Sequence, residues 1–472
     1  MLESYADVKL SPKQIEIELP RRPKEKPVHQ EAEKTTLPPQ QPLLRRLGKH
    51  PTFMHYNRLI FLVAVINLAV LGYGAASGMW WTGEGIALST LSNLVVLNIS
   101  AAILIRQQYV INLLFKTATS VPTSWPLSIR WLMGKVYHFG GIHVGGAVVG
   151  TVWFAIYVGS LTYHLAKGLP GVSLGLAVVS YALLAFLVLM VVMAWPSLRA
   201  RYHDYFERTH RLGGWTALAL FWVQTALFVN IQRGTADFSQ ALLSSPGFWA
   251  LLLVTFSVAL PWLRLKKVPV RIERPSNHVT LVRFNYGVTP FAGSSTAVSR
   301  NPLLEWHSFA NVPAPGKEGF RLTISRAGDW TGQFIDDMPS HLWVKGIPTA
   351  GVGNIDRLFK RVVWIATGSG IGPTLPHLLS QEVPARLVWS TRSPRETYGD
   401  GLVDEILAVQ PDALIWDTNE HGRPDLVQLA YEAYVDFDAE AVICISNKKL
   451  TWQVVYGMES RGIPAYGAIW DS

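Results

Sequence analysis

Six long apolar stretches dominate this sequence and limit what the chain can fold into. Each is about 20 residues long, the length that an α-helix needs to cross the hydrocarbon core of a bilayer. Charged residues make up only 16% of the 472-residue chain, and 49% of its residues are hydrophobic. We therefore predict an integral, multi-pass membrane protein. The six predicted spans lie near residues 59–78, 85–105, 139–162, 170–195, 212–231 and 246–263.

The distribution of basic residues predicts the orientation of these spans. Arginine and lysine gather in the N-terminal tail, in the second and fourth loops and just after the sixth span, whereas the other loops hold at most one each. Because basic loops stay on the cytosolic side, both termini are expected in the cytosol, and the net charge of +9 indicates topology rather than nucleic-acid binding. Residues 1–50 are polar and dotted with proline, so we expect a disordered cytosolic tail.

The pattern of the sequence changes after residue 267. Strand-like runs separated by turn residues predict a small β-barrel over residues 268–357, and strands that alternate with helical patterns predict a parallel α/β sheet over residues 358–472. The predicted fold is thus a six-helix membrane domain over residues 51–267, then the barrel, then a nucleotide-binding α/β domain. The predicted strands lie near residues 278–285, 320–326, 341–345, 361–366, 386–391, 412–416 and 440–445.

A glycine-rich turn follows the first strand of the α/β part. Glycines in such a turn let the backbone approach a pyrophosphate, and the N-terminus of the following helix meets the negative charge. We expect this turn to bind a dinucleotide, although an ordinary tight turn between strand and helix remains an alternative. The candidate residues are Gly368, Gly370, Gly372 and Pro373.

The end of the next strand bears on which nucleotide would bind. Ser390 and Arg392 stand where an acidic residue is expected for NAD. A basic residue with a nearby hydroxyl suits the ribose 2′-phosphate of NADPH better, which predicts NADPH as the nucleotide. A merely solvated Arg392 remains the alternative.

Several motifs in the second half of the chain carry a resemblance to a known family. Their order and spacing resemble the dehydrogenase domain of the NADPH oxidase and ferric reductase family, within the ferredoxin–NADP reductase superfamily. The motifs are Glu305-Trp306-His307-Ser308-Phe309-Ala310, Gly328-Asp329-Trp330-Thr331, the glycine turn, Trp389-Ser390-Thr391-Arg392, Gly422-Arg423-Pro424 and an aromatic near the end, Trp470.

The resemblance implies both cofactors and roles for individual residues. It implies that FAD contacts His307, Phe309 and Thr331, and that NADPH binds the glycine turn. It also implies that Trp470 covers the flavin ring and that Cys444 lies near the nicotinamide, as the two candidate catalytic residues.

This sequence departs from the family mainly in its flavin half. Ala310 replaces a threonine that binds the flavin in the family, and residues 346–349 read Gly-Ile-Pro-Thr where the family has Gly-Pro-Phe-Gly. Cys444 is followed by Ile445 and Ser446 rather than by glycine and proline. Cys444 is also the single cysteine of the chain, which excludes an intrachain disulfide and a four-cysteine metal site.

Two histidines in the predicted membrane domain are candidate haem ligands. His143 and His210 start the third and fifth spans, and each precedes a Gly-Gly pair that would permit either close helix contact or a flat macrocycle. We expect one b-type haem near the cytosolic face, with His138 as the alternative to His143. Fourteen residues further along, where the family repeats its histidines, stand Tyr157 and Gln224, so a second haem is not expected. Histidines at headgroup level without haem remain the other interpretation.

A narrower resemblance covers the stretch from Lys135 to His143. It resembles the third span of fungal ferric-reductase-like membrane proteins associated with enzymes similar to non-ribosomal peptide synthetases and with conidiation signalling. This implies a role in signalling or secondary metabolism.

Three functions are therefore open. The first is a membrane-bound NADPH-dependent oxidoreductase that passes electrons through FAD, and through one inner haem, to an unidentified acceptor. The others are an electron conduit across the whole membrane and a non-catalytic nucleotide-binding scaffold. The expected partners are the lipid bilayer, NADPH and a small-molecule acceptor, with no nucleic acid.

Overall fold

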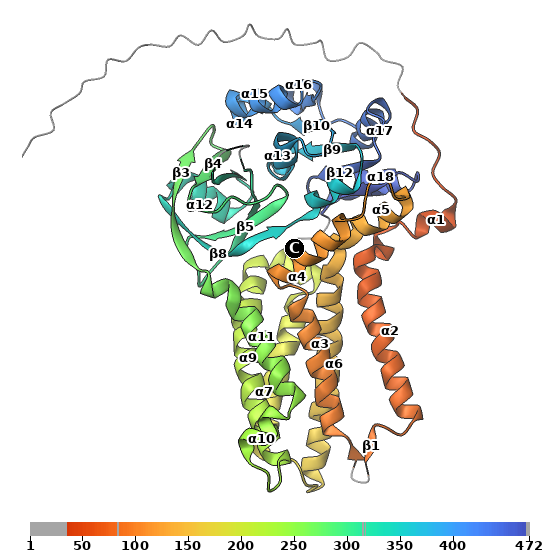
Figure 1. Ribbon diagram of the computed structural model, residues 1–472, viewed down its shortest axis with the longest axis vertical. Coiled ribbons are helices and arrows are strands. Elements are labelled where there is room, and N and C mark those ends of the chain that lie inside the picture. The colour runs from red at the N-terminus through yellow and green to blue at the C-terminus, as the bar shows by residue number, and fades with distance from the viewer. Residues whose placement is uncertain (1–34, 83–84, 314–315, 317, 469–472) are drawn as a thin grey trace, which may run out of the picture. The chain divides into compact units, whose positions relative to one another are not determined.

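The computed structural model describes residues 35–82, 85–313, 316 and 318–468 (Figure 1). The chain divides into two compact units, Met1–Thr36 and Leu37–Ser472. The disordered tail predicted over residues 1–50 therefore ends too late, because residues from Leu37 onward belong to the second unit. There the Gln41 N–H donates a hydrogen bond to the Ser460 carbonyl. Residues 1–34 of the predicted tail lie outside the described residues.

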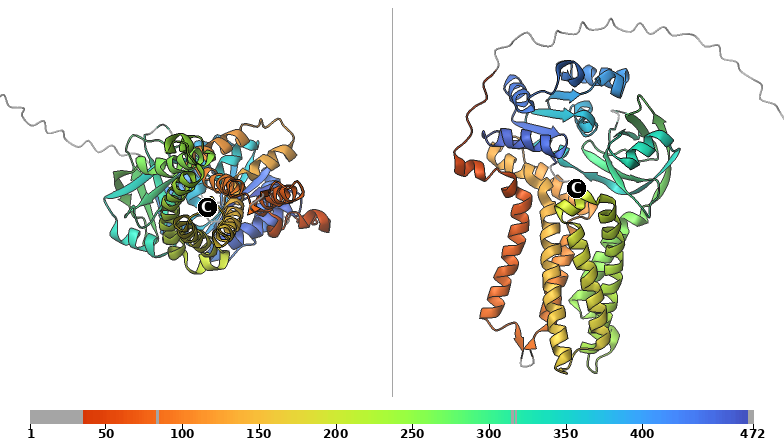
Figure 2. Two further views of the ribbon diagram at one scale, coloured as in Figure 1. Left: turned by 90° about the horizontal axis from the view of Figure 1, so that it is seen from below. Right: turned by 180° about the vertical axis from the view of Figure 1, so that it is seen from behind.

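Five helices in the described part of the chain are long and apolar enough to cross a membrane. A sixth candidate arises if α3 (Leu88–Leu104) and α4 (Gln108–Thr119), which meet at a bend of 72°, form one broken span. Seen from behind, the long helices run side by side (Figure 2). Length and composition alone make them candidates, so the six spans stay a prediction. The five helical runs are α2 (His55–Ala76), Leu127–Ala166, α7 (Leu174–Met193), α9 (His203–Gln232) and α11 (Pro246–Leu263).

The segments predicted as basic loops are mostly helical. The chain between the second and third predicted spans forms α4, α5 and a 3-10 helix, and the chain before the fifth span forms α8 and the first turns of α9. These helices lack a long apolar run because they are amphipathic: α4 turns Ile111 and Phe115 into a core shared with the nucleotide-type sheet. The remaining helical elements of this half are α1 (Leu43–Leu47), η1 (Pro51–Phe53), α5 (Leu127–Met133), η2 (Gly134–Phe139), α6 (Gly140–Ala166), α8 (Pro196–Arg201) and α10 (Phe238–Leu243).

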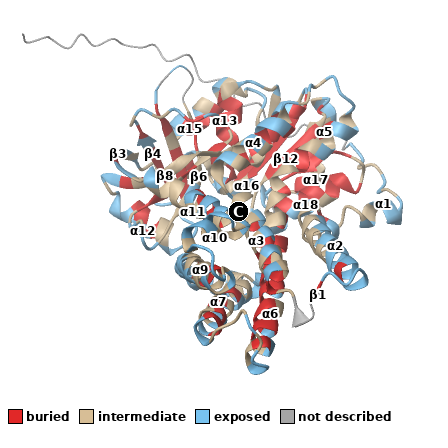
Figure 3. Cartoon of the chain, turned by 60° about the horizontal axis from the view of Figure 1, so that its bottom comes forward, coloured by how far each residue is buried: buried red, intermediate tan, exposed pale blue. Residues whose placement is uncertain are grey.

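Glycines on α6 let neighbouring helices approach it closely. A Cβ on Gly141 would lie 2.3 Å from the backbone oxygen of Tyr56 on α2, and one on Gly146 would lie 2.8 Å from that of Asn98 on α3. This face of α6 is mostly buried (Figure 3). The Gly-Gly pair of this span was predicted to permit either close helix contact or a flat macrocycle, and the structure shows close helix contact.

A six-stranded antiparallel sheet follows the helices, in the order β6-β5-β8-β3-β4-β7. Backbone hydrogen bonds between Val312 and Arg321 draw its two edges together, so the sheet is curled like the predicted barrel. The strand β5 was missed because its hydroxyl-rich sequence lacks the alternating apolar pattern. The elements are β3 (Lys266–Glu273), β4 (Val279–Phe284), β5 (Ser294–Ser299), β6 (His307–Ala310), β7 (Phe320–Ser325), α12 (Asp329–Asp337), β8 (His341–Ala350) and η3 (Val352–Leu358); the hairpin β1 (Trp81–Thr82) and β2 (Gly85–Ile86) is separate.

A five-stranded parallel sheet completes the chain, in the order β11-β10-β9-β12-β13. The four strands predicted in this region are confirmed with shifts of one or two residues. Because both faces are covered by helices, the central strand β9 is almost wholly buried. The elements are β9 (Val362–Thr367), η4 (Gly368–Gly370), α13 (Ile371–Ser380), β10 (Ala385–Thr391), α14 (Pro394–Tyr398), α15 (Asp400–Val409), β11 (Leu414–Asp417), α16 (Thr418–His421), α17 (Leu426–Asp436), β12 (Ala441–Ile445), α18 (Lys448–Glu459) and β13 (Ala465–Tyr466).

Two ion pairs join the helix α5 and its continuation η2 to the parallel sheet. Arg130, which is 4% exposed, binds both carboxylate oxygens of Glu440 at 2.6 and 3.0 Å. Lys135 binds the buried carboxylate of Glu459, which also accepts a hydrogen bond from Trp131 at 3.0 Å. Removing one member would leave the other charge desolvated without a partner, so these pairs determine how the two elements dock.

We expect Glu440→Gln to lower the free energy of unfolding by about 1.5–3 kcal/mol at pH 7, because the largely buried Arg130 keeps a hydrogen-bond acceptor but loses its counter-charge. Hydrogen bonds from Arg130 and Lys360 hold the pKa of Glu440 below its ordinary value, although partial burial opposes them. A carboxyl group whose pKa is lower in the folded state than in the unfolded state stabilises the folded protein at pH values above its unfolded-state pKa. This stabilisation is lost as the pH falls through the folded-state pKa.

The difference between Glu440→Gln and the parent protein should therefore shrink in acid. Thermal unfolding of the full chain in detergent, followed by tryptophan fluorescence from pH 7 to pH 4, measures it. The control is Glu382→Gln, which breaks an exposed pair with Arg357 and should cost less than about 0.5 kcal/mol. Equal losses in the two variants, or a loss that does not depend on pH, would contradict the argument.

Candidate functional site

The glycine turn lies at the carboxyl end of β9, where the parallel sheet changes direction. From β9 the sheet extends to β10 and β11 on one side and to β12 and β13 on the other. Open α/β sheets bind ligands outside the carboxyl ends of their strands at such a switch point. Thr367 at the end of β9 and Ser446 beyond β12 join their hydroxyl groups across it. The predicted pyrophosphate site thus occupies the position where this fold accepts a nucleotide.

The fold constrains the three glycines of the turn to different degrees. Gly368 has φ of +48°, which glycine adopts without strain. A Cβ on Gly370 would lie 2.0 Å from the carbonyl oxygen of Ile445 on β12, so this position is needed for packing of the sheet. A Cβ on Gly372 would meet only Thr323, at an ordinary 3.4 Å. The fold itself would therefore accept a small side chain at position 372.

The helix that follows the turn presents an uncapped N-terminus. No side chain caps α13, although the N–H of its first residue, Ile371, already donates to the Gly368 and Ser369 carbonyl groups of the preceding 3-10 turn. The partial positive charge of this helix N-terminus favours a bound anion. Pro373 lies in this first turn, where its missing N–H costs no intrahelical hydrogen bond. Thr374 turns its hydroxyl inward to the Gly370 carbonyl at 2.9 Å, which braces the turn.

The two residues predicted after β10 differ in accessibility. Ser390 is only 6% exposed, whereas Arg392 is exposed, and its guanidinium has no hydrogen-bond or ion-pair partner among the described residues. Arg423 is exposed as well, in the loop between α16 and α17, directly after Gly422 with φ of +70°. The carboxyl edge of the sheet therefore carries two cationic side chains that could meet a 2′-phosphate.

A buried tyrosine behind the turn was not found from the sequence. The hydroxyl of Tyr398 lies 3.8 Å from where a Cβ on Gly368 would stand. Burial raises the pKa of this phenol to about 12, against hydrogen bonds with Thr391 and Ser325. Trp389 donates from Nε1 to the Gly368 carbonyl at 3.0 Å. These contacts come from elements far apart in the chain, so no local motif could have revealed them.

The two predicted catalytic residues receive no geometric support. Cys444 is fully buried in an apolar core with Val363 and Val454, and burial raises the pKa of its thiol to about 12. A thiol in this setting packs rather than reacts. Its catalytic role stays a prediction. Trp470 lies outside the described residues.

The predicted flavin residues line up with a row of stacked aromatic rings. His307 stacks on Trp330 with ring centroids 4.0 Å apart, and Phe309 and Phe334 stack on the same tryptophan at 6.1 and 5.2 Å. His307 Nε2 and Trp330 Nε1 are buried without a hydrogen-bond partner among the described residues. Burial lowers the pKa of His307, so the ring is neutral at physiological pH. These two nitrogens are polar atoms that a bound cofactor could satisfy.

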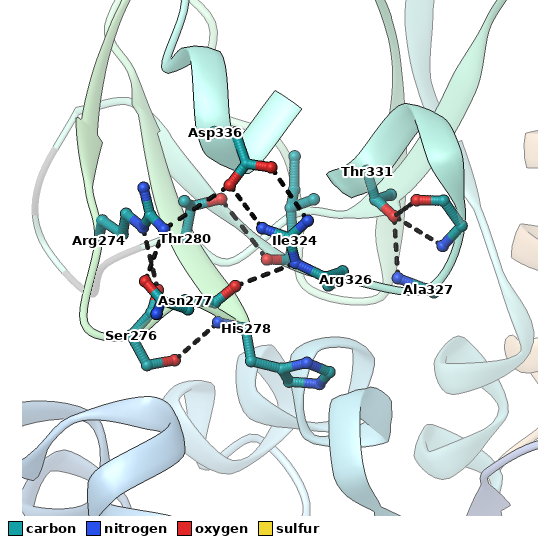
Figure 4. A network of polar contacts seen from close by, with 11 residues as sticks. Arg274, Ser276, Asn277, His278, Thr280, Ile324, Arg326, Ala327, Thr331 and Asp336 are labelled. Carbon is teal, nitrogen blue, oxygen red and sulfur yellow. Dashed lines mark hydrogen bonds and ion pairs between the residues drawn. The ribbon is translucent and has the colours of Figure 1, made fainter. Parts of the chain in front are cut away.

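Thr331 is already committed within the protein. Its hydroxyl accepts hydrogen bonds from the N–H groups of Ala327 and Gly328, at 2.9 and 3.0 Å, at the start of α12 (Figure 4). Nearby, Arg326 is held by Asp336 at 2.6 Å. The predicted contact between Thr331 and flavin phosphates stays a prediction, and these bonds give the hydroxyl a helix-capping role instead.

The stretch that replaces the family's phosphate turn is bound by α4. Gln108 accepts from the Ile347 N–H at 3.0 Å and donates to its carbonyl at 3.1 Å, and Asn112 does the same for the Ala350 N–H and the Pro348 carbonyl at 2.8 and 3.0 Å. The two amide side chains thus form with the β8 backbone the kind of hydrogen bonds that a neighbouring strand would form. The sequence departure at residues 346–349 is explained by this docking, which the sequence did not reveal.

A lysine beside the flavin motif was also missed. The Lys345 ammonium lies 4.2 Å from the ring centre of Trp306, which belongs to the motif, and 4.5 Å from that of Trp262 on α11. Burial, with a smaller contribution from Arg211, lowers the pKa of Lys345 to about 8. Lys345 thus lies between the barrel and the helices, and its ammonium gains or loses its proton at mildly alkaline pH.

The two predicted haem ligands are close together. The ring centroids of His143 on α6 and His210 on α9 lie 6.1 Å apart. His143 Nδ1 lies 2.8 Å from the Ala102 carbonyl oxygen, a bond that leaves Nε2 available, and His210 Nδ1 is buried without a partner among the described residues. His138 lies in η2 and stacks on His55 instead. Within the described ranges, no group of three or more potential ligand side chains could hold a metal ion.

The positions that the family uses for an outer haem are closed. Gln224 donates to the Tyr157 hydroxyl at 3.1 Å, and both side chains are buried. Phe154 and Phe228 pack on Tyr157 with ring centroids 5.6 and 6.3 Å away. Side chains of α6 and α9 meet across this region, and no histidine stands at either position.

Comparisons with known proteins identify relatives of the chain. Residues 352–472 match a family model described as the C-terminal domain of Adenylate-forming reductase 03009. Adenylate-forming reductases 03009 and 06235 of Coprinopsis cinerea are each 44% identical to this chain, over 432 and 427 residues. The matches cover 91% and 90% of this chain but 41% of either relative, so the chain spans about two fifths of their length. The resemblance to ferric reductases stays a prediction.

Two solved structures align with part of the chain at low similarity. Phthalate dioxygenase reductase matches 43% of this chain and 67% of its own, with 18% identity and a TM-score of 0.34. A ferredoxin–NADP⁺ reductase from Neisseria gonorrhoeae, solved with FAD and NADP, matches 43% of this chain and 98% of its own, with 12% identity and a TM-score of 0.35.

The glycine turn yields a matched pair of variants. We expect Gly370→Ala to destabilise the protein by about 1–3 kcal/mol, because its methyl group would collide with the Ile445 carbonyl. Gly372→Ala should keep or raise the stability, by up to about 1 kcal/mol, since alanine favours the helix. Thermal unfolding of the full chain measures both, and NADPH titration should show weaker binding in Gly372→Ala if a ligand approaches there. The same loss of stability in both variants would refute these assignments.

Proposed function

We propose that the chain is a membrane-bound, NADPH-dependent oxidoreductase that uses FAD. The observation that carries this proposal is the glycine turn at the switch point of the parallel sheet, followed by an uncapped helix N-terminus. Gly372 admits the close approach of a pyrophosphate, and the first turn of α13 meets its charge. Arg392 is free to pair with a 2′-phosphate, which distinguishes NADPH from NADH.

The flavin half supports FAD through its unsatisfied atoms. His307 Nε2 and Trp330 Nε1 are buried polar atoms that lack a partner among the described residues, and the stacked rings around Trp330 offer a flat apolar wall. When bound, FAD would accept a hydride from the nicotinamide and release electrons singly. The protein would supply orientation through His307 and Phe309 and keep water away from the reacting atoms.

A single inner haem is the next step of the proposal. His143 and His210 approach each other, and the bond from His143 to the Ala102 carbonyl has the form that orients ligand histidines. The closed packing of Tyr157 with Gln224 argues against a second haem and therefore against conduction across the whole membrane. We propose that the acceptor is reduced near the cytosolic face, with both termini in the cytosol.

The relatives suggest the setting of this reaction. Their name joins a reductase to an adenylate-forming activity, and we propose that this chain corresponds to the reductase portion, in secondary metabolism or signalling. A non-catalytic nucleotide-binding scaffold is the second candidate. It is favoured by Thr331, whose hydroxyl caps α12, and by the α4 amides that bind residues 347–350.

The nucleotide preference tests the first step. Arg392→Ala should weaken NADPH binding by about 1.5–3 kcal/mol and leave NADH binding unchanged, because only NADPH carries the phosphate that the arginine pairs with. Fluorescence titration of the full chain with both nucleotides measures this. Arg395→Ala is the control, since that arginine is bound to Asp400 and Asp404 and should not change the preference. Equal losses for both nucleotides in Arg392→Ala would exclude the 2′-phosphate contact.

Absorption spectra before and after dithionite test the cofactors. We expect a flavin band and at most one haem per chain, with a low-spin spectrum that His210→Ala abolishes or converts to a five-coordinate form. His203→Ala is the control, because His203 starts the same helix but is exposed. Two haems per chain would contradict the inner-haem proposal, and protein produced with ample haem yet free of it would exclude haem. A missing flavin band would favour the scaffold.

A further inference from the structure

A small cavity lies between the start of α2, η2 and α18, away from the nucleotide and flavin residues. Its volume is about 30 Å³, roughly two to three times what one water molecule needs, so it admits a group of a few atoms rather than a nucleotide. The side chains with polar atoms that line it are Lys49, His55, Lys135, Tyr137, His138, Trp452, Tyr456 and Glu459.

The charges around the cavity do not cancel. Glu459 is matched by Lys135, with which it forms a buried ion pair. Lys49 has no carboxylate partner among the described residues, and its ammonium lies over the Trp131 ring at 3.8 Å. Two lysines therefore face one carboxylate, which leaves one positive charge in a partly desolvated site. Such a site favours an anion.

A buried histidine independently indicates a missing ligand. His138 is only 4% exposed, yet neither of its ring nitrogens has a hydrogen-bond partner among the described residues. The ring lines the cavity and stacks on His55, 5.9 Å away, which also lacks a hydrogen bond there. The ring nitrogens of His138 are reached through the cavity rather than enclosed by protein atoms, so a ligand there that accepts hydrogen bonds would give them a partner.

The N-terminus of α2 adds to the same field. This 22-residue helix begins at His55, and its first turn holds no acidic residue that would compete with an anion. The partial positive charge of a helix N-terminus favours anions, and phosphate groups in particular. The donors approach from three elements, Lys49 before η1, His55 on α2 and His138 on η2, which suits a tetrahedral anion better than a planar carboxylate.

We propose that this cavity binds a phosphate oxyanion. The proposal does not depend on hydride transfer, since none of these residues belongs to the nucleotide or flavin site. The cavity adjoins the beginning of the candidate span α2, so the phosphate of a phospholipid headgroup and free inorganic phosphate share the chemistry that the site recognises. Binding would bridge α2 and η2 to α18 of the parallel sheet, and should therefore stabilise the folded chain.

Thermal unfolding of the full chain separates the two sources. One arm adds inorganic phosphate to protein in neutral detergent, against chloride at equal ionic strength. The other compares nanodiscs of phosphatidylcholine with and without phosphatidylglycerol. Stabilisation in the first arm identifies a free phosphate site, and stabilisation confined to the second identifies a headgroup site.

Variants decide whether this cavity is responsible. Lys49→Gln should weaken the stabilising anion about tenfold, the loss expected for one charge-assisted hydrogen bond. His138→Gln should also weaken binding of the anion, because glutamine keeps a hydrogen-bond donor but on a shorter reach into the cavity. If this variant fails to fold, Lys49→Gln alone tests the proposal. The control is Lys449→Gln, which removes one charge from exposed α18 surface outside the cavity. No stabilisation in either arm, or equal stabilisation of Lys49→Gln and the parent protein, would overturn the proposal.

Discussion

The docking of η2 and α5 onto the parallel sheet is the interaction on which the rest of the structure depends. Arg130 and Lys135 place two positive charges in surroundings from which water is largely excluded. Among the described residues, their carboxylate partners are Glu440, just before β12, and Glu459, at the end of α18. Because an unpaired charge at either site would be strongly unfavourable, the helical half and the nucleotide-type sheet have one preferred arrangement. The segment that carries these charges continues directly into α6, which bears His143.

The same principle of side-chain docking explains the altered flavin half. In the family, the turn at residues 346–349 is expected to face a cofactor. In this chain Gln108 and Asn112 pair with its backbone as a neighbouring strand would. The N–H groups of Ile347 and Ala350 are thereby already occupied. Any flavin would then depend on His307 and on the aromatic row around Trp330, where buried nitrogens are left without partners.

The two ends of the helical half are built differently. Near the sheet, His143 and His210 face one another and the α9 residue Gly214 has open space beside it. Further along the same helices, Tyr157 and Gln224 bond directly and phenylalanine rings fill the space around them. Tyr157 and Gln224 therefore offer no imidazole ligand at this end of the two helices.

The sequence alone determined the elements whose signal is local. Apolar runs marked the long helices, periodicity and glycine marked the strands around β9 and the turn at Gly368, and the spacing of His143 and His210 marked a facing pair. The tertiary structure alone decided the rest: that the supposed loops are the helices α4 and α5, that Gly370 serves the sheet, that Thr331 caps α12, that Cys444 is buried, and that His138 faces a cavity with His55. The reason is physical. Helices and turns are specified by neighbouring residues, whereas the partner of a buried charge, hydroxyl or thiol comes from a segment up to hundreds of residues away.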